Sequence, residues 1–350
     1  MAHRSPITNA LTIDVEDYFQ VSAFAPYIRR DEWDSRECRV ERNVGRILEL
    51  LAARDVKATF FTLGWIAERY PAMVRRIVDQ GHELASHGYG HQRASDLDEP
   101  AFFDDVDRAK RLLEDIGGQA VLGYRAPSFS IGDKNLWALD VLLRAGYRYS
   151  SSIYPVRHDH YGSPDAPRFA HEVRPGLLEV PPTTLRLFDR NLPSSGGGFF
   201  RLLPYSVSRW MLQQVNRRDG EAAVFYFHPW EIDPDQPRVG HAPLRSYSEG
   251  AAVFPLQLVL LLSRPGQDFE GGEFVMTEQR PRMQSRPMVL PLGLGDAAII
   301  ATGPRPVRGA AGFYRVHLRH AISRVHRGGR LGLELLLHDA PQATDAGRWL

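Results

Sequence analysis

Near its N-terminus the chain reads ALTIDVEDYF, from Ala10 to Phe19. The apolar start of this stretch is typical of a short strand, and three carboxylates follow it, on Asp14, Glu16 and Asp17. An acidic cluster after a strand is usually a solvated turn or a helix cap. If polar residues also follow other strands of a parallel α/β sheet, however, they meet at one rim, where such folds build their sites.

The chain up to Trp230 alternates strand and helix patterns, which predicts an α/β architecture. The expected strands are Ala10–Val15, Ala58–Leu63, Glu83–Ser86, Gly123–Pro127, Tyr147–Ile153, Leu178–Val180 and Ala222–Phe227. The expected helices are Val40–Arg54, Pro71–Gln80, Pro100–Ile116, Leu136–Ala145 and Tyr205–Arg217. Proline at the first turn and glycine just past the end mark several of these boundaries.

After Trp230 the pattern changes. Ile232–Ser248 is rich in Pro, Asp, Arg and Gly and is typical of a linker. Beyond it, short strand-like runs are separated by Pro/Gly turns, which predicts an all-β unit. These runs are Leu256–Leu262, Gly272–Met276, Val289–Leu292 and Ala297–Ala301.

Composition excludes several classes of protein. A net charge of +1 over 350 residues gives no sign of bulk binding to nucleic acid, so no nucleic-acid partner is expected. Cys38 is the only cysteine, which rules out an internal disulfide and a cysteine zinc cluster. Met1–Asn9 lacks the apolar run of a signal peptide, and the longest apolar stretch, Val253–Ser263, is too short to span a bilayer. We therefore expect a cytoplasmic protein, with peripheral attachment to the inner membrane left open.

Two further clusters carry ionisable residues. His87 and His91 lie four residues apart in SHGYGH, and His228 ends the aromatic run FYFH. Two histidines and one carboxylate can form a facial metal site with open positions, and a free carboxylate and a further histidine can then act as base and acid. With 13 histidines in the chain, a chance pair is a real alternative, and a histidine after an aromatic strand is commonly a packing residue. The order and separation of the three clusters favour the metal site.

Six ordered motifs between Asn9 and Arg238 resemble the polysaccharide deacetylase (NodB-homology) family, most of all its subgroup associated with bacterial exopolysaccharide loci. They are TIDVEDYFQVSAF (12–24), ATFFTLGWIA (58–67), GHELASHGYGH (81–91), YRAPSFS (124–130), YSSSIYP (149–155) and FHPWEIDP (227–234). The resemblance implies a distorted (β/α) barrel of NodB-homology type with its site at the carboxyl ends of the strands.

The same resemblance assigns roles to individual residues. It implies Asp14 as general base, Glu16 or Asp17 as the metal carboxylate, His87 and His91 as the other ligands, Arg125 as the residue that orients the base, and His228 as general acid. The family usually has two adjacent aspartates where this chain has Asp14-Val15, so the ligand must come later. Period-two alternation favours Glu16, and Asp17 takes the role if the segment has already turned.

The stretch Phe254–Ala340 resembles the C-terminal part of a 2-oxoglutarate/Fe(II) dioxygenase. The residues that carry this resemblance are FPLQLVLLLSRPGQDFEGGEFVMTEQRPRMQSRP (254–287), RVHLRHAISRVHRGGR (315–330) and LLLHDA (335–340). It implies His320 as an iron ligand and Arg330 as the partner of the 2-oxoglutarate carboxylate. The His-x-Asp pair expected just before Phe254 is missing: residues 245–250 read RSYSEG, and His241 lacks an acid two residues on. A lone histidine binds Fe(II) poorly, so we expect this stretch to be catalytically inert, without Fe(II) or 2-oxoglutarate.

The sequence thus predicts a deacetylase domain at 1–238, a linker at 239–253, a partial, double-stranded β-helix-like segment at 254–340 and a tail at 341–350. The predicted function is metal-dependent removal of N-acetyl groups from amino sugars of a polysaccharide or its lipid-linked precursor, with Zn²⁺ as the expected metal. Two alternatives stay open, an oxidoreductase working through the C-terminal segment and an inactive carbohydrate-binding module.

Overall fold

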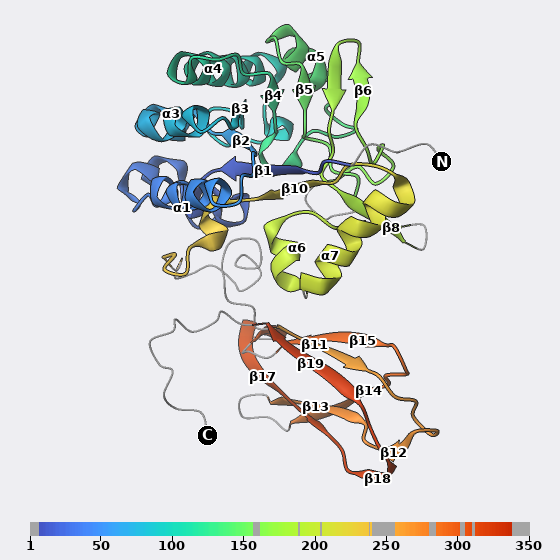
Figure 1. Ribbon diagram of the computed structural model, residues 1–350. Helices are drawn as coiled ribbons and strands as arrows, with labels where there is room; N and C mark the ends of the chain where they lie inside the picture. The colour runs from blue at the N-terminus through green and yellow to red at the C-terminus, as the bar shows by residue number, and fades with distance from the viewer. Residues whose placement is uncertain are drawn as a thin grey trace, which may run out of the picture. The chain divides into compact units, whose positions relative to one another are not determined.

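The computed structural model describes residues 7–156, 162–187, 190–203, 205–237, 239, 256–279, 285–301, 305–309 and 312–337. By its internal contacts the chain divides into two compact units, Met1–Ala251 and Ala252–Leu350 (Figure 1). Except for residue 239, the expected linker at 239–253 lies outside the described residues, and so does the expected tail at 341–350.

An eight-stranded sheet organises the first unit (Figure 1). Its spatial order is β10-β1-β2-β3-β4-β5-β7-β6, and every neighbouring pair is parallel except β6 with β7. The strands are β1 (Ala10–Val15), β2 (Thr59–Thr62), β3 (Glu83–Ser86), β4 (Gly123–Tyr124), β5 (Tyr149–Ser150), β6 (His171–Arg174), β7 (Leu177–Glu179) and β10 (Val224–Phe227). A separate hairpin pairs β8 (Thr184–Leu187) with β9 (Arg190–Pro193).

The expected distorted barrel is confirmed only in part, because the strand pairing leaves this sheet open. Among the described residues no pairing links the two edge strands, β6 and β10. The antiparallel hairpin β6–β7 ends the parallel series, because a strand that turns straight back cannot continue right-handed β-α-β winding. The α/β class itself is confirmed by the parallel strands and the helices between them.

Amphipathic helices connect the parallel strands. They are α1 (Val40–Ala52), α2 (Gly64–Arg69), α3 (Pro71–Asp79), α4 (Glu99–Gly117), α5 (Trp137–Arg144), α6 (Gly197–Leu202) and α7 (Tyr205–Gln214). A π-helical turn, η6 (Val215–Asp219), extends α7. Asp98 accepts a hydrogen bond at the start of α4, and Gly118 ends that helix with a positive φ of 64°. None of the helices that the structure describes is long and apolar enough to cross a membrane.

Short 3₁₀ turns shape the rim at the carboxyl ends of the strands and the loops around it. They are η1 (Tyr18–Gln20), η2 (Ser22–Phe24), η3 (Arg30–Ser35), η4 (Ala94–Asp96), η5 (Pro127–Phe129) and η7 (Pro229–Ile232). The main core packs apolar side chains of the sheet strands against the helices and most of these turns, with Phe19, Phe60, Phe102 and Trp230 among its largest side chains. The rim is therefore anchored in the core.

The second unit is all-β, as expected, and its sheets are small and antiparallel. Three strands pair in the order β15-β11-β19, four in the order β14-β13-β17-β16, and β12 pairs with β18. The strands are β11 (Leu256–Leu261), β12 (Phe269–Gly271), β13 (Phe274–Gln279), β14 (Arg286–Leu290), β15 (Ala297–Ala301), β16 (Arg305–Gly309), β17 (Gly312–Ile322), β18 (Val325–Gly328) and β19 (Gly332–Leu337). A small core of Val259, Phe274, Met276 and Ile300 lies among them.

Candidate metal and catalytic site

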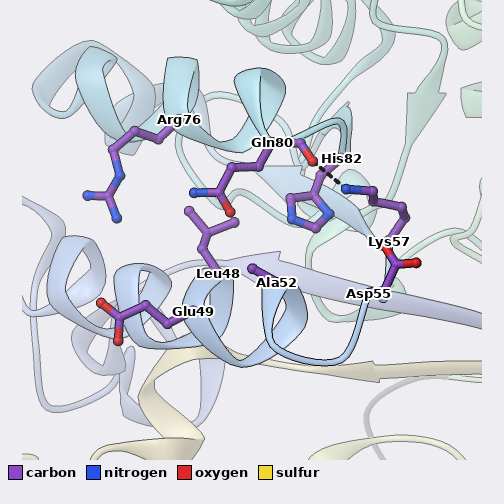
Figure 2. Close-up of a pocket in the computed structure, with 8 residues that line it drawn as sticks. All are labelled: Leu48, Glu49, Ala52, Asp55, Lys57, Arg76, Gln80 and His82. Carbon is purple, nitrogen blue, oxygen red and sulfur yellow. Dashed lines mark hydrogen bonds between the residues drawn. The ribbon is translucent and has the colours of Figure 1, made fainter.

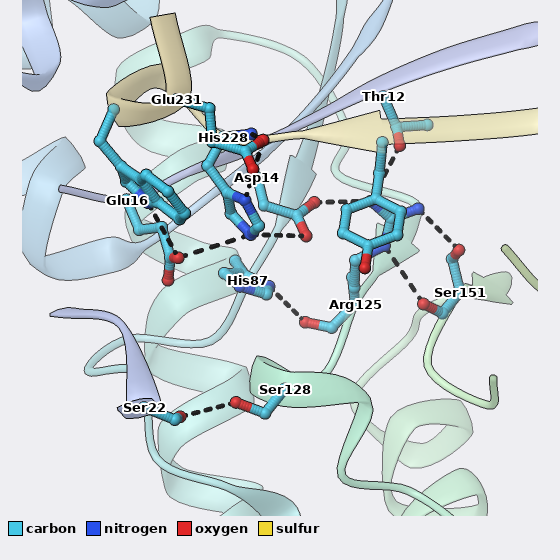
Figure 3. A network of polar contacts seen from close by, with 12 residues as sticks. Thr12, Asp14, Glu16, Ser22, His87, Arg125, Ser128, Ser151, His228 and Glu231 are labelled. Atoms are coloured by element: carbon cyan, nitrogen blue, oxygen red, sulfur yellow. Dashed lines mark hydrogen bonds and ion pairs between the residues drawn. The ribbon is translucent and has the colours of Figure 1, made fainter. Parts of the chain in front are cut away.

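The candidate residues from the first unit gather at the carboxyl ends of neighbouring strands (Figure 3). Asp14 lies near the end of β1, His87 follows β3, Arg125 follows β4 and His228 follows β10. Because the spatial order is β10-β1-β2-β3-β4, residues more than 200 positions apart in the sequence become neighbours. The sheet thus produces one polar cluster from motifs that are scattered along the chain.

Glu16, His87 and His91 form a group that could hold a metal ion. Each offers one ligand atom, and these atoms all lie within 4.8 Å of one another. His91 Nε2 is 2.6 Å from Oε2 of Glu16, and the two imidazole rings are 5.4 Å apart. One carboxylate oxygen and two imidazole nitrogens are a donor set that suits Zn²⁺ and related divalent ions. Among the described residues this is the one such group of three or more histidine, cysteine or acidic side chains.

Hydrogen bonding and burial leave His87 in the state that a metal ligand requires. Its Nδ1 lies 2.8 Å from the backbone oxygen of Arg125, which leaves Nε2 as the nitrogen free for coordination. Burial lowers the pKa of His87 to about 4, so its ring is neutral near pH 7, as a metal ligand must be.

The Glu16 carboxylate is ionised. Burial alone would raise its pKa, but the neighbouring imidazoles, His91 first among them, lower it to about 2. Trp230 Nε1 also donates a hydrogen bond of 3.4 Å to Oε1 of Glu16. The structure therefore holds a negatively charged carboxylate next to two imidazoles.

Asp17, the alternative metal carboxylate, is placed elsewhere. Its side chain accepts hydrogen bonds from the backbone N–H groups of Tyr18, Arg39 and Val40. These contacts cap the 3₁₀ turn η1 and the start of helix α1. The structure thus brings Glu16, and not Asp17, to the two histidines.

Arg125 fixes the orientation of Asp14. Its Nη1 donates to Oδ1 of Asp14 at 2.6 Å, and both side chains are buried. Three further N–H groups of the guanidinium donate to the Thr12 hydroxyl at 2.8 Å and to the hydroxyl and the backbone oxygen of Ser151. The Phe61 ring lies 4.1 Å from the guanidinium carbon. Because the planar guanidinium is held at several points and binds Oδ1 of Asp14, the other carboxylate oxygen, Oδ2, faces the rest of the cluster.

His228 lies between three carboxylates. Its Nε2 is 3.9 Å from Asp14 Oδ2 and 3.5 Å from Glu16 Oε1, and its Nδ1 is 3.5 Å from Oε2 of Glu231. Burial would lower its pKa, but Glu231, Glu16 and Asp14 together raise the pKa of His228 to about 9. The ring also stacks on Trp230, with centroids 4.8 Å apart. The imidazole is therefore positively charged near pH 7 and can donate a proton.

Sequence reasoning missed several of these supporting residues. Glu231 and Trp230 stand in the same FHPWEIDP motif as His228, only two or three residues later, so the motif itself contained the signal. Thr12 and Ser151 could not be found in this way, because a hydroxyl group carries no distinctive pattern. Their role depends on the spacing between β1 and the loop after β5.

A separate pocket lies at the opposite end of the strands (Figure 2). It is lined by Leu48, Glu49, Ala52, Asp55, Lys57, Arg76, Gln80 and His82, which come from α1, α3 and the segments just before β2 and β3. The Lys57 ammonium donates to the backbone oxygen of Gln80. No candidate site residue lines this pocket, so it is distinct from the polar cluster.

In the second unit, His320 lies on β17 and its ring stacks on Phe274, with centroids 5.4 Å apart. Arg330 lies between β18 and β19. His320 belongs to no group of close metal-ligand side chains among the described residues. His241 and residues 245–250, which stand near the place of the expected His-x-Asp pair, lie outside the described residues.

Three family models match successive parts of the chain. Residues 32–150 match the model described as polysaccharide deacetylase, and residues 151–252 match a domain of unknown function, DUF3473. Residues 237–340 match the model described as an oxygenase catalysing oxidative methylation of damaged DNA. Successive parts of the chain are therefore similar to a polysaccharide deacetylase domain, to DUF3473 and to this oxygenase. The oxygenase match begins at residue 237, earlier than the resemblance seen in the sequence, which begins at Phe254.

Individual relatives match shorter parts. An uncharacterized protein of Mycobacterium tuberculosis is 44% identical over 91 residues, which are 26% of this chain and 39% of the relative. A peptidoglycan-N-acetylglucosamine deacetylase of Bacillus cereus is 33% identical over 96 residues, 27% of this chain and 35% of the relative. The chain thus matches little more than a third of these proteins. A crystal structure of a polysaccharide deacetylase from Mycobacterium smegmatis is similar over 65% of this chain and 79% of its own, at 24% identity and a TM-score of 0.47.

Proposed function

We propose that the N-terminal region is a metal-dependent hydrolase that removes N-acetyl groups from amino sugars of a polysaccharide or of its lipid-linked precursor. The observation that carries this proposal is the meeting of two histidines and Glu16 with the Asp14–Arg125 pair and His228 at one rim. The polysaccharide deacetylase match and a relative named for acetylglucosamine support the class of substrate.

Zn²⁺ is the metal that we propose, because imidazole and carboxylate ligands with open positions are its usual catalytic environment. When bound, the ion would act as a Lewis acid on the acetyl carbonyl and lower the pKa of a water molecule. Glu16, His87 and His91 would hold it, and the bond from His87 Nδ1 to the Arg125 backbone would keep that ring in the required tautomer.

The side chains next to this group fit the two proton transfers of amide hydrolysis. Asp14 would accept the proton of the attacking water on Oδ2, while Arg125 holds Oδ1. His228 would donate a proton from Nε2 to the leaving amine as the C–N bond breaks, giving acetate and a free amino sugar. Glu231 lies on the far side of the His228 ring and stabilises its charged form.

Acetate release from a panel of substrates tests the proposal. Chitin oligomers, poly-N-acetylglucosamine and peptidoglycan should include a substrate from which the Zn²⁺-loaded protein releases acetate, and a chelator should stop the reaction. The same preparation, given Fe(II), ascorbate and 2-oxoglutarate, should form no succinate. Acetate release from none of the three by a metal-loaded protein would favour a binding module. Iron-dependent succinate formation, lost in His320→Ala, would show an oxygenase instead.

His228→Ala is expected to slow hydrolysis by roughly 10²–10⁴-fold, since it removes the proton donor for the leaving amine. Metal content should be unchanged, because His228 is outside the ligand group. The pH profile of kcat should also lose its alkaline limb, which reports deprotonation of the acid. Glu231→Gln should shift that limb to lower pH, because Glu231 raises the pKa of His228. Identical profiles in the variants and the unchanged protein would remove His228 from the mechanism.

A further inference from the structure

The two candidate ligand histidines lie on a loop rather than on a helix. On a helix, residues four apart face the same side automatically. Here β3 ends at Ser86, and His91 has a positive φ of 55°, a conformation that costs energy in a residue other than glycine. The approach of His91 to His87 must therefore be imposed by contacts from outside the loop.

Such contacts reach every backbone polar group between the two histidines. The Gly88 N–H donates to the Ser86 hydroxyl. The carbonyls of Gly88 and Tyr89 accept hydrogen bonds of 2.9 and 2.8 Å from the first two residues of α2, Gly64 and Trp65. The Gly90 carbonyl accepts a hydrogen bond from Nη2 of Arg30. The two remaining groups, the N–H groups of Tyr89 and Gly90, both donate hydrogen bonds to one side chain.

That side chain is Asp105, on α4. Its Oδ2 accepts from the Tyr89 N–H at 3.0 Å, and its Oδ1 accepts from the Gly90 N–H at 3.3 Å. A Cβ at position 88 would lie 2.7 Å from Oδ2 of Asp105, and Gly88 has a positive φ of 76°. A carboxylate thus reaches into the turn between the two histidines, where a side chain on residue 88 would crowd it.

Arg30 completes the arrangement on the other side of the turn. Its guanidinium occupies the space that a Cβ on Gly90 would need, and it lies 5.1 Å from the Trp33 ring centre. Arg30 and Asp105 also attract each other electrostatically. A positively charged side chain from η3, Arg30, and a negatively charged one from α4, Asp105, therefore hold the peptide groups of the turn.

We propose that Asp105 is a positioning residue for the metal site, which sets the distance between His87 and His91 without touching the ion. This inference rests on the proposed function, since it assumes that the two histidines bind a metal. An aspartate has four acceptor positions and no donor, so it can serve both N–H groups at once. An asparagine offers one oxygen and turns an NH₂ group toward the second N–H.

Asp105→Asn should therefore weaken Zn²⁺ binding to the full-length protein by roughly 10–100-fold, the range for loss of a supporting partner of a metal ligand. Zn²⁺ affinity would be measured by competition with a chromophoric chelator. Asp104→Asn is the matched control, because it removes the same charge from the neighbouring, exposed position of α4 and should bind Zn²⁺ as the unchanged protein does. A purely structural role would lower the melting temperature of both metal-free and metal-loaded protein without changing the affinity of the folded state.

A second variant keeps the test valid if Asp105→Asn fails to fold. Arg30→Met keeps an apolar stem over Trp33 but removes the donor to the Gly90 carbonyl, and it should also weaken Zn²⁺ binding. Equal affinities for Asp105→Asn, Asp104→Asn and the unchanged protein would overturn this inference alone. Failure of the unchanged protein to bind Zn²⁺ would overturn the proposed function, and this inference with it.

Discussion

Replacing either His87 or His91 with alanine is expected to leave the purified protein without its bound divalent ion. A site with three protein ligands that loses one keeps only two, and the nearby side chains that could substitute, Asp14 and His228, are held by Arg125 and Glu231. Metal analysis should find about one ion per chain in the unchanged protein and close to none in either variant. His171→Ala is the control, since that histidine lies on β6 and outside the ligand group.

Variants of the two neighbouring carboxylates, Glu16 and Asp17, should give opposite results in the same metal analysis. Glu16→Gln is expected to lose the metal, because a neutral amide oxygen is a weaker ligand than a carboxylate. Asp17→Asn should keep the metal but reduce the free energy of unfolding by about 1–3 kcal/mol, the usual effect of weakening hydrogen bonds to a charged group. Full metal occupancy in both histidine variants, or its loss only in Asp17→Asn, would contradict the ligand assignment.

The strands that carry the site were predictable because their sequence pattern is local. β1 and β3 have the bounds expected from their apolar runs, and each is followed by polar residues. The resemblance to a known family then assigned roles to those polar residues. What it could not decide was Glu16 against Asp17, because that choice depends on where the chain leaves the extended conformation.

The turn beyond β1 explains in physical terms why Glu16, and not Asp17, lies beside the two histidines. Glu16 lies between the end of β1 and Asp17, and its carboxylate, like that of Asp14, faces Nε2 of His228. Asp17 is the N-cap of η1 and contacts the start of α1, more than 20 residues away in the sequence. The alternation of side-chain direction expected for a strand therefore predicts the position of Glu16, one residue past the end of β1, but not that of Asp17.

Other parts of the fold were not visible in the sequence because they are short or depend on distant contacts. The parallel strands β4 and β5 have two residues each, so the expected runs Gly123–Pro127 and Tyr147–Ile153 are too long. The half-exposed hairpin strand β6 reads HEVR, which shows no clear apolar alternation. In the second unit, β17 crosses a run rich in Arg and His that composition alone would place in a loop.

Asp14→Asn should reduce deacetylation by roughly 10²–10⁴-fold while the metal stays bound. An amide cannot accept the proton of the attacking water, so the loss should appear in kcat rather than in substrate affinity. Asparagine nearly matches aspartate in shape, and its Oδ1 can still accept from Arg125 Nη1, as Oδ1 of Asp14 does at 2.6 Å. Steady-state acetate release and metal content, measured on the same preparation, separate loss of the base from loss of the ion.

Asp14→Asn should also lower the free energy of unfolding, because Asp14 is the ionic partner of a fully buried arginine. Breaking a buried ion pair by removing one charge typically costs about 3–5 kcal/mol. Arg125 keeps its bonds to Thr12 and Ser151 in the variant, so we expect a folded protein with a lower melting temperature. Arg125→Met provides the matched comparison: it breaks the same ion pair but leaves the Asp14 carboxylate in place. Turnover in Asp14→Asn should therefore fall well below that of Arg125→Met at equal metal occupancy, and near-unchanged turnover in Asp14→Asn would place the base elsewhere.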